Sequence, residues 1–382
     1  MLCFHGFATF AANGPGSKPP MVLFLLVALL LLQRRRMTAA GIATGLATLT
    51  WQPVLIALLP AGLVVAALGH RGLRERVVAA IRFGLGGALT LGVTVAGFAA
   101  AGALDAFLDG YWIANARYTE QPGALEGPLT AWALVVRANG WTSWVVVTGC
   151  VATLVLGGWA LRRRPFHTDA LALAATTLGG LAWCLIAFNG PPDVFLMLPA
   201  AACGIGGAVG LLRHVGATRP RAHRVVAVAG LAWVLVSLVA TTHFSVTTRT
   251  RGLVPQTSAA EALFRRLPDD ATVFSAEAPL PLALTGHRSI SRYVLFGNGM
   301  TSYIDGEREG GLPGYRAWLL EEAPTIVLTP SHGIRGPLEP VLRDYVLVGA
   351  ASGWVAYMHK DVDLDTRVRV MRALARHDPD RA

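Results

Sequence analysis

Long runs of apolar residues with almost no charge dominate the first two-thirds of the chain. They lie at residues 20–33, 38–69, 83–104, 141–161, 168–188, 194–213 and 224–242. Several of these runs have the roughly 20 residues that a helix needs to cross the hydrocarbon core of a bilayer. The pattern therefore predicts an α-helical, polytopic membrane bundle.

The run at 38–69 is too long for a single untilted crossing. As one helix its residues would extend about 48 Å, against a hydrocarbon core of about 30 Å. The tract that ends in Trp51-Gln52-Pro53 interrupts the run, and proline disfavours a helical conformation in the residue before it. We expect a hairpin of two helices, 38–49 and 53–69, with Trp51 and Gln52 at its tip, and eight membrane helices in total.

Clusters of arginine separate the apolar runs and predict their orientation. They lie at Arg34–Arg36, at Arg71, Arg74 and Arg76, at Arg162–Arg164, and between Arg213 and Arg224. Basic residues next to membrane helices are enriched on the cytoplasmic side. The sequence therefore predicts a multi-pass plasma-membrane protein in which residues 1–19, the loop 105–140 and residues 243–382 are extracytoplasmic.

The last third of the chain has a different pattern, in which helix and strand signals alternate. Strands are expected at 272–275, 289–294, 325–329, 345–350 and 353–358, and helices at 258–267, 313–322 and 336–343. Strands separated by helices imply an α/β layer. We expect an extracytoplasmic loop remnant at 1–19, a transmembrane domain at 20–242, a small extracytoplasmic α/β domain at 255–360 and a charged terminal helix at 361–382.

Composition and charge support this division. The chain is 53% hydrophobic and 15% charged, with a mean hydropathy of +0.50, which excludes an ordinary soluble enzyme. Residues 251–382 hold 15 of the 33 basic and 16 of the 23 acidic side chains, so the first 250 residues hold the other 18 bases and 7 acids. Membrane topology accounts for this basic surplus, and no nucleic-acid partner is expected. The chain has no CxxC and no HExxH motif, so no metal site is expected.

Two cations on the predicted outer side are candidates for binding an anion. Lys18 precedes Pro19-Pro20 and the first membrane helix, where a helix N-terminus favours anions; the alternative is an interfacial anchor. Arg117 has a guanidinium group that suits a phosphate or carboxylate; the alternative is an ion pair with Glu120 or Asp109. Asp193 lies in a tight outer turn, where it is expected to cap the following helix.

The outer loop 105–140 also carries aromatic and amide side chains. If its tract is helical, Tyr111, Asn115 and Tyr118 share one face. An interfacial aromatic belt is the alternative for Tyr111. Within the membrane, the small-xxx-small pairs Gly41/Gly45 and Gly206/Gly210 predict close helix packing.

A resemblance to a known family rests on residues 18–53. The tract Lys18-Pro-Pro-Met-Val-Leu-Phe is followed by the arginine cluster and then by Ala-Gly-Ile-Ala-Thr-Gly-Leu-Ala-Thr-Leu-Thr-Trp-Gln-Pro, residues 40–53. This arrangement resembles the GT-C class of polytopic membrane glycosyltransferases, and most of all the prokaryotic dolichyl-phosphate-mannose mannosyltransferases. Such proteins place a hairpin of this kind after a basic cytoplasmic turn, and many end in an extracytoplasmic α/β domain.

The resemblance implies transfer of a sugar, mannose as the first choice, from a polyprenyl-phosphate donor in the bilayer to a glycan or protein acceptor. It implies that Lys18 and Arg117 bind the donor phosphate and that Asp109 is a weak candidate for the catalytic base. Sugar or lipid contacts are expected from Trp51, Gln52, Tyr111, Asn115 and Tyr118. No cofactor is specified, although the chemistry is compatible with a divalent cation.

The sequence departs from the family at its start. The family carries its catalytic acid in the first long outer loop, whereas residues 1–19 contain no Asp or Glu. The chain is therefore expected to be an N-terminally incomplete transferase, whose activity needs an upstream segment. The alternative, from a different class, is a non-catalytic membrane scaffold or transporter-like protein of the cell envelope. A transporter favours charged residues at mid-membrane, which the apolar runs almost lack.

Overall fold

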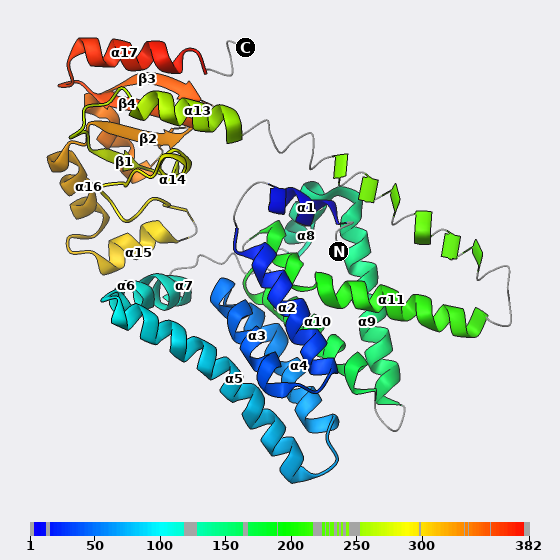
Figure 1. Ribbon diagram of the computed structural model, residues 1–382. Coiled ribbons are helices and arrows are strands. Elements are labelled where there is room, and N and C mark those ends of the chain that lie inside the picture. Colours follow the sequence, from blue (N-terminus) through cyan, green and yellow to red (C-terminus); the bar gives the residue numbers. More distant parts are fainter. Residues whose placement is uncertain are drawn as a thin grey trace. The chain divides into compact units, whose positions relative to one another are not determined.

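A computed structural model describes residues 4–12, 16–117, 128–162, 167–188, 190–216 and 253–377, apart from Asn298, His332, Arg335 and Ser352, and isolated positions between 224 and 243. The chain divides into two compact units (Figure 1). The helical unit comprises Met1–Phe107 and Gln121–Val246, and the α/β unit comprises Leu108–Glu120 and Thr247–Ala382. Each unit is described by itself.

Helices make up the described part of the helical unit. They are α1 (His5–Ala12), α2 (Lys18–Gln33), α3 (Met37–Thr50), α4 (Val54–Leu68), α5 (Leu73–Ala100), α8 (Pro128–Asn139), α9 (Ser143–Leu161), α10 (Thr168–Ile186) and α11 (Leu198–Gly216). Two 3₁₀ turns, Gly140–Thr142 and Pro191–Leu196, precede α9 and α11, and the short α6 (Leu104–Leu108) lies where the two units divide.

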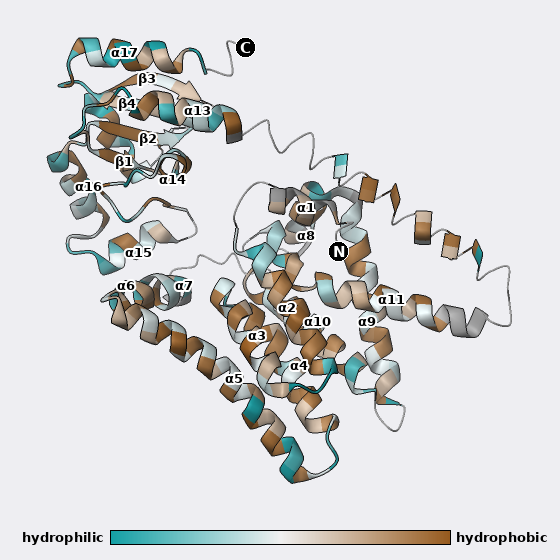
Figure 2. Cartoon of the chain, in the orientation of Figure 1, coloured by the Kyte–Doolittle hydropathy of each residue, from teal (hydrophilic) through white to brown (hydrophobic). Residues whose placement is uncertain are grey.

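The helices of this unit are apolar over most of their length (Figure 2). Among the described residues, α5, α9 and α10 are long and apolar enough to cross a membrane, while α2, α3, α4 and the stretch 198–211 are apolar but shorter. Many of their large apolar side chains are exposed, such as Leu30, Leu63 and Leu85. Exposed leucines along helices are what a lipid-facing surface requires. Three described helices thus have the length and composition to cross a membrane, which agrees with the membrane character predicted from the sequence.

The predicted hairpin is present. α3 ends at Thr50, Trp51 takes an extended conformation with φ −164° and ψ 110°, and α4 begins at Val54 directly after Pro53. Proline breaks the helix here because it has no N–H to donate and restricts the residue before it. Trp51 and Gln52 lie in the turn, as expected.

The packing role predicted for Gly41 and Gly45 is confirmed. A Cβ atom on Gly41 would overlap the carbonyl oxygen of Phe83 in α5, and one on Gly45 would come within 2.8 Å of the Thr90 Cβ. The prediction for Gly206/Gly210 is wrong for the described residues, because a Cβ at either position would meet nothing within 4 Å. Gly204 approaches α9 instead. The direction in which α11 turns its small residues is set by tertiary packing and not by their spacing.

Three elements of the helical unit differ from the sequence-based expectation. α5 begins at Leu73, ahead of the apolar run predicted at 83–104, because its charged first turns are also helical. α8 lies within the predicted loop 105–140. α1 lies within the predicted loop 1–19, and the rings of Phe4, Phe7 and Phe10 meet the Phe195 ring edge-on, with centroids 5.4–6.0 Å apart. The three-residue spacing of these phenylalanines is the signal for a helix with one apolar face.

The α/β unit is built on a four-stranded sheet in the order β1-β2-β4-β3. β1 (Val273–Ser275) and β2 (Ile326–Pro330) are parallel, and β4 (Trp354–His359) pairs antiparallel with β2 and with β3 (Tyr345–Ala351). The helical elements are a π-helical turn (Asp109–Ile113), α7 (Ala114–Arg117), α13 (Leu253–Phe264), α14 (Leu280–Thr285), α15 (Met300–Glu307), α16 (Gly311–Glu322), a 3₁₀ helix (Gly336–Asp344) and α17 (Leu364–Leu374).

Helices cover both faces of this sheet. Ile326 and Leu328 of β2 belong to a core with α13, α14 and α17, whereas Val327 belongs to a second core with α15, α16 and the 3₁₀ helix. Successive strand residues point to opposite faces, so a strand that is apolar at every position needs such a cover on each side. The predicted C-terminal α/β sheet is confirmed.

Local details of the α/β unit correct two expectations. The segment 289–294 runs beside β1 without forming a strand: Ile290 N–H donates to the Val273 carbonyl, while the Ser289 hydroxyl accepts from the Ser275 N–H. Serine side chains compete in this way with ladder hydrogen bonds. α13 begins at Leu253, so Ser258 does not open the helix. α17 is capped by Asp363, whose Oδ1 accepts from the Thr366 N–H at 2.8 Å.

Candidate functional site

Aromatic and charged side chains gather at one end of the helical unit. Lys18 begins α2, Trp51 follows the last residue of α3, Trp183 lies in the last turn of α10, and Asp193 lies in the 3₁₀ turn before α11. The arginines at 34–36 and 71–76 occupy the opposite ends of the same helices. The two ends of the bundle therefore differ in chemistry: one is basic, and the other holds, among the described residues, an ion pair next to tryptophans.

The ion pair joins residues 175 positions apart in the sequence. Lys18 Nζ lies 2.9 Å from Asp193 Oδ1 and donates a hydrogen bond to it. Lys18 is 8% exposed and Asp193 is 3% exposed, so both charges are largely removed from solvent. The Lys18 ammonium also lies 2.9 Å from the centroid of the Trp51 ring. We call Lys18, Asp193, Trp51 and Trp183 the tryptophan–lysine cluster.

The tryptophans complete this cluster. The rings of Trp51 and Trp183 meet edge to face, with centroids 5.8 Å apart and an interplanar angle of 89°. A desolvated ammonium over an indole face gains cation–π stabilisation of about 2 kcal/mol. The indole N–H of Trp183 is buried and has no acceptor among the described residues. Buried donors are usually satisfied, so this one is available to an acceptor group on a ligand.

Prolines set the backbone on both sides of the ion pair. Pro19 and Pro20 occupy the first turn of α2, and Pro191 and Pro192 occupy the first turn of the 3₁₀ helix that carries Asp193. A proline in the first helical turn removes no intrahelical hydrogen bond, because the N–H groups there have no intrahelical acceptor. The two charged side chains are thus held by rigid helix starts.

The fold brings together two of the candidates: Lys18, which was predicted to bind an anion, and Trp51, which was predicted to contact sugar or lipid. Gln52 is half-buried in the same turn. Asp193 and Trp183 were not singled out as site residues. The Gly-Pro-Pro-Asp tract marks Asp193 as lying in a turn, but no local signal in the sequence shows that its carboxylate meets Lys18.

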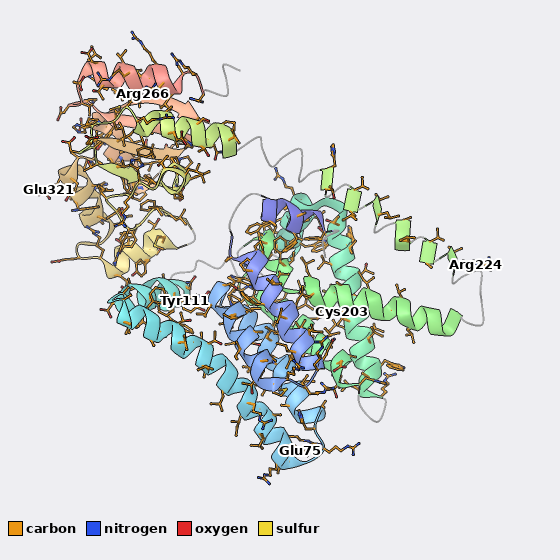
Figure 3. All side chains as sticks on the ribbon, viewed as in Figure 1. Glu75, Tyr111, Cys203, Arg224, Arg266 and Glu321 are labelled. Atoms are coloured by element: carbon orange, nitrogen blue, oxygen red, sulfur yellow. The ribbon has the colours of Figure 1, made fainter. Side chains whose placement is uncertain are left out.

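The remaining candidates belong to the α/β unit. Asn115 is exposed, and its side-chain amide donates to the carbonyl oxygens of Gly110 and Tyr111 at 3.1 and 3.0 Å. Tyr111 (labelled in Figure 3) meets Trp112 edge-on, and burial raises the pKa of its phenol to about 12. Asn115 therefore stabilises its own helical turn, and Tyr111 stays protonated at neutral pH.

Asp109, the weak candidate for the base, is half-buried in the π-helical turn. The pKa of Arg292 is raised mainly by its hydrogen bond to Tyr293, and the negative charge of Asp109 raises this pKa further. Burial raises the pKa of Tyr303, and the Asp109 charge again contributes. The side chain of Arg117 and all of Tyr118 lie outside the described residues. Asp109 and Lys18 belong to different units.

Metal ligands do not converge in the part of the chain that the structure describes. No group of three His, Cys, Asp or Glu side chains there is close enough to hold an ion.

Comparison with known proteins adds no relative: no protein-family model matches the chain, and no curated protein is significantly similar to it.

Proposed function

We propose that this chain is a multi-pass plasma-membrane glycosyltransferase, or the C-terminal part of one. It transfers a sugar, mannose as the first choice, from a polyprenyl-phosphate donor to an extracytoplasmic glycan or protein acceptor. The observation that supports this proposal is the tryptophan–lysine cluster, a buried charge pair against indole rings at one end of an apolar helix bundle. In a membrane bundle, a buried ionisable group is by default a candidate functional site.

The cluster suits the phosphate of the donor. An ammonium group carries three donor hydrogens, and the hydrogen bond to Asp193 uses one of them. The Trp51 ring, whose centroid lies 2.9 Å from the ammonium nitrogen, takes up a second, and the third remains suitable for a phosphate oxygen. Because Asp193 and Trp51 hold the ammonium in position, it needs no reorganisation when charge develops on the departing phosphate. Asp193 is thus a positioning residue, and Lys18 is the residue that contacts the donor.

The tryptophans and the apolar helix surfaces suit the rest of the donor. Indole rings offer large apolar faces with one polar edge, which match a sugar with its C–H face and hydroxyl groups. The buried Trp183 N–H supplies a donor for a sugar or phosphate oxygen. The exposed leucines of α2 and α4 provide a surface for an isoprenoid tail.

The proposal includes an orientation. The arginine clusters are cytoplasmic, and the tryptophan–lysine cluster lies at the outer end of eight membrane helices. The α/β unit is extracytoplasmic, and Asp109 is the weak candidate for the base that takes the acceptor proton. Arg117 is the second candidate for the donor phosphate.

A charge reversal separates a donor-binding role from a merely structural ion pair. The variant Lys18→Asp with Asp193→Lys keeps opposite charges in contact but moves the ammonium to the other helix start. We expect it to fold and to lose at least tenfold in affinity for a radiolabelled polyprenyl-phosphate mannose, measured with purified protein in nanodiscs. The matched control reverses Arg35 and Asp169, an ion pair of 3.1 Å at the basic end of the unit, and is expected to bind as the wild type does.

Two outcomes would contradict the proposal. If the Lys18/Asp193 reversal binds the donor as well as the wild type, the pair is structural. If the wild type binds the donor but neither it nor a longer chain with the upstream segment transfers the sugar, the chain is a non-catalytic membrane protein of the envelope, the alternative predicted from the sequence.

A further inference from the structure

The basic end of the helical unit holds a large cavity. Its volume is about 790 Å³, and its walls come from the turn between α2 and α3, the turn between α4 and α5, and the first turns of α5. The residues that line it include Arg35, Arg36, Arg74, Glu75 and Arg82. Glu75 lies in the first turn of α5 and is labelled in Figure 3. We call this space the arginine pocket.

The charges around the arginine pocket are unbalanced. Arg35 is paired with Asp169 at 3.1 Å, whereas the Glu75 carboxylate accepts only a hydrogen bond from the backbone N–H of Arg71, at 3.2 Å, and keeps its negative charge. Arg36, Arg74 and Arg82 also line the pocket, so its lining holds three further arginines against one glutamate and has an excess of positive charge. A guanidinium presents a planar fork of donors that matches phosphate oxygens.

The groups that can bind an anion lie on two walls of the arginine pocket, one from α5 and one from the start of α3. Arg74, Val78 and Arg82 are four residues apart along α5, so they form one stripe of that helix. Met37 and Thr38, which also line the pocket, belong to the first turn of α3. The first N–H groups of a helix have no intrahelical acceptor and carry a partial positive charge. Arginines on one wall and a helix N-terminus on the other both favour an anion.

Membrane topology explains why arginines occur at this end but not why they converge. The bias toward cytoplasmic basic residues is satisfied by any position in the turns, and Arg34 and Arg162 satisfy it outside the lining. Basic pockets between helices on the cytoplasmic side are the form that sites for phosphate-bearing headgroups take in membrane proteins.

We propose that the arginine pocket binds a phosphate group, from the headgroup of an anionic phospholipid or from free phosphate. Arg36, Arg74 and Arg82 bind the phosphate oxygens together with the N–H groups that open α3. This site lies at the opposite end of the bundle from the tryptophan–lysine cluster, and it does not rest on the glycosyltransferase proposal.

The test uses the full chain in a neutral detergent at physiological salt. Native mass spectrometry follows titration with phosphatidylglycerol and, separately, with zwitterionic phosphatidylcholine. Equilibrium dialysis follows radiolabelled inorganic phosphate. Saturable binding of phosphatidylglycerol without inorganic phosphate would identify a lipid headgroup as the source, and binding of inorganic phosphate would show that the phosphate group alone is sufficient. Binding of neither probe would overturn the proposal.

Variants then locate the site. Arg74→Gln with Arg82→Gln should weaken binding of the effective probe at least tenfold, since two charge-assisted contacts are lost. The matched control, Arg34→Gln with Arg162→Gln, removes the same charge at the same end and should change binding less than threefold, since charges outside the lining make no direct contact and act only through screened attraction. Equal losses in the two double variants would show diffuse attraction to a basic surface and would overturn the proposal.

A third variant keeps the charge constant. Val78 is exposed and lies between the two arginines of the α5 stripe. Val78→Trp adds bulk to the pocket wall without changing any charge and is expected to weaken binding by a similar factor. Because position 78 is exposed, this variant tests the pocket even if the double arginine variant does not fold. Binding as tight as that of the wild type would contradict the pocket as the site.

Discussion

Removing Asp193 is the most direct test of the buried ion pair. The variant Asp193→Ala leaves the Lys18 ammonium at a position that is 8% exposed, without its partner. Breaking a buried pair in this way costs about 3–5 kcal/mol, because the remaining charge stays desolvated. The Trp51 ring offsets part of this cost through the cation–π contact. We therefore expect a loss of about 3 kcal/mol in the free energy of unfolding.

The chain supplies its own control at the other end of the bundle. The side chains of Arg35 and Asp169 are 33% and 52% exposed, although their contact distance of 3.1 Å is similar to that of the buried pair. Exposed pairs contribute about 0–1 kcal/mol. Asp169→Ala removes the same chemical group and should cost no more than that. Burial, and not distance, decides the difference between the two variants.

Thermal unfolding in detergent micelles, followed by tryptophan fluorescence, measures both effects. For a unit of 150–250 residues, 1 kcal/mol shifts the Tm by about 2–4 °C. Asp193→Ala should therefore lower the Tm by about 6–12 °C, and Asp169→Ala by less than about 4 °C. The double variant Lys18→Met with Asp193→Ala should recover part of the loss, because no unpaired charge remains. Equal shifts for the two single variants would refute the reasoning from burial.

Three further predictions concern packing, pH and topology. Gly41→Leu should destabilise the helical unit by at least about 1–3 kcal/mol in the same assay, because its side chain meets the backbone of α5, whereas Gly84→Leu should be tolerated, since a Cβ there meets nothing within 4 Å. Burial raises the pKa of Tyr315 to about 12, so its contribution to stability is complete below pH 10, the ordinary value, and is lost as the pH rises toward 12. Urea unfolding at pH 8, 10 and 11 should show this decline, which should be smaller in Tyr315→Phe. In a chain without its native cysteines, an impermeant thiol reagent on intact cells should label Leu125→Cys but not Leu73→Cys, and the opposite result would contradict the proposed orientation.

Much of the architecture could be predicted from hydrophobic periodicity and from the residues that end helices and strands. The break at Pro53 predicted the hairpin, because proline acts through its own covalent structure wherever it lies. The strands β2 and β4 were predicted from short apolar runs bounded by turn residues. α1 and α8 were missed: three phenylalanines at three-residue spacing mark α1, but the His, Gly and Pro residues around them favoured a loop.

The candidate site was only half predictable. Lys18 and Trp51 stood out as an isolated cation and an aromatic residue at a break, and both belong to the tryptophan–lysine cluster. Asp193 was predicted only as a helix cap, and the arginine clusters only as topology signals. Whether an arginine lines a cavity depends on the side of the helix that it occupies and on the neighbouring turn.

The sequence by itself determined where helices are apolar, where they break and which ends are basic, because these properties depend on residues within a few positions of one another. Tertiary structure alone decided that Asp193 meets Lys18 across 175 residues. It also decided that Gly41 and not Gly206 is a point of close approach, and that arginines from two turns line one cavity. Contacts of this kind depend on how helices pack side by side, and this packing is set by the fit of many side chains at once and not by any local pattern.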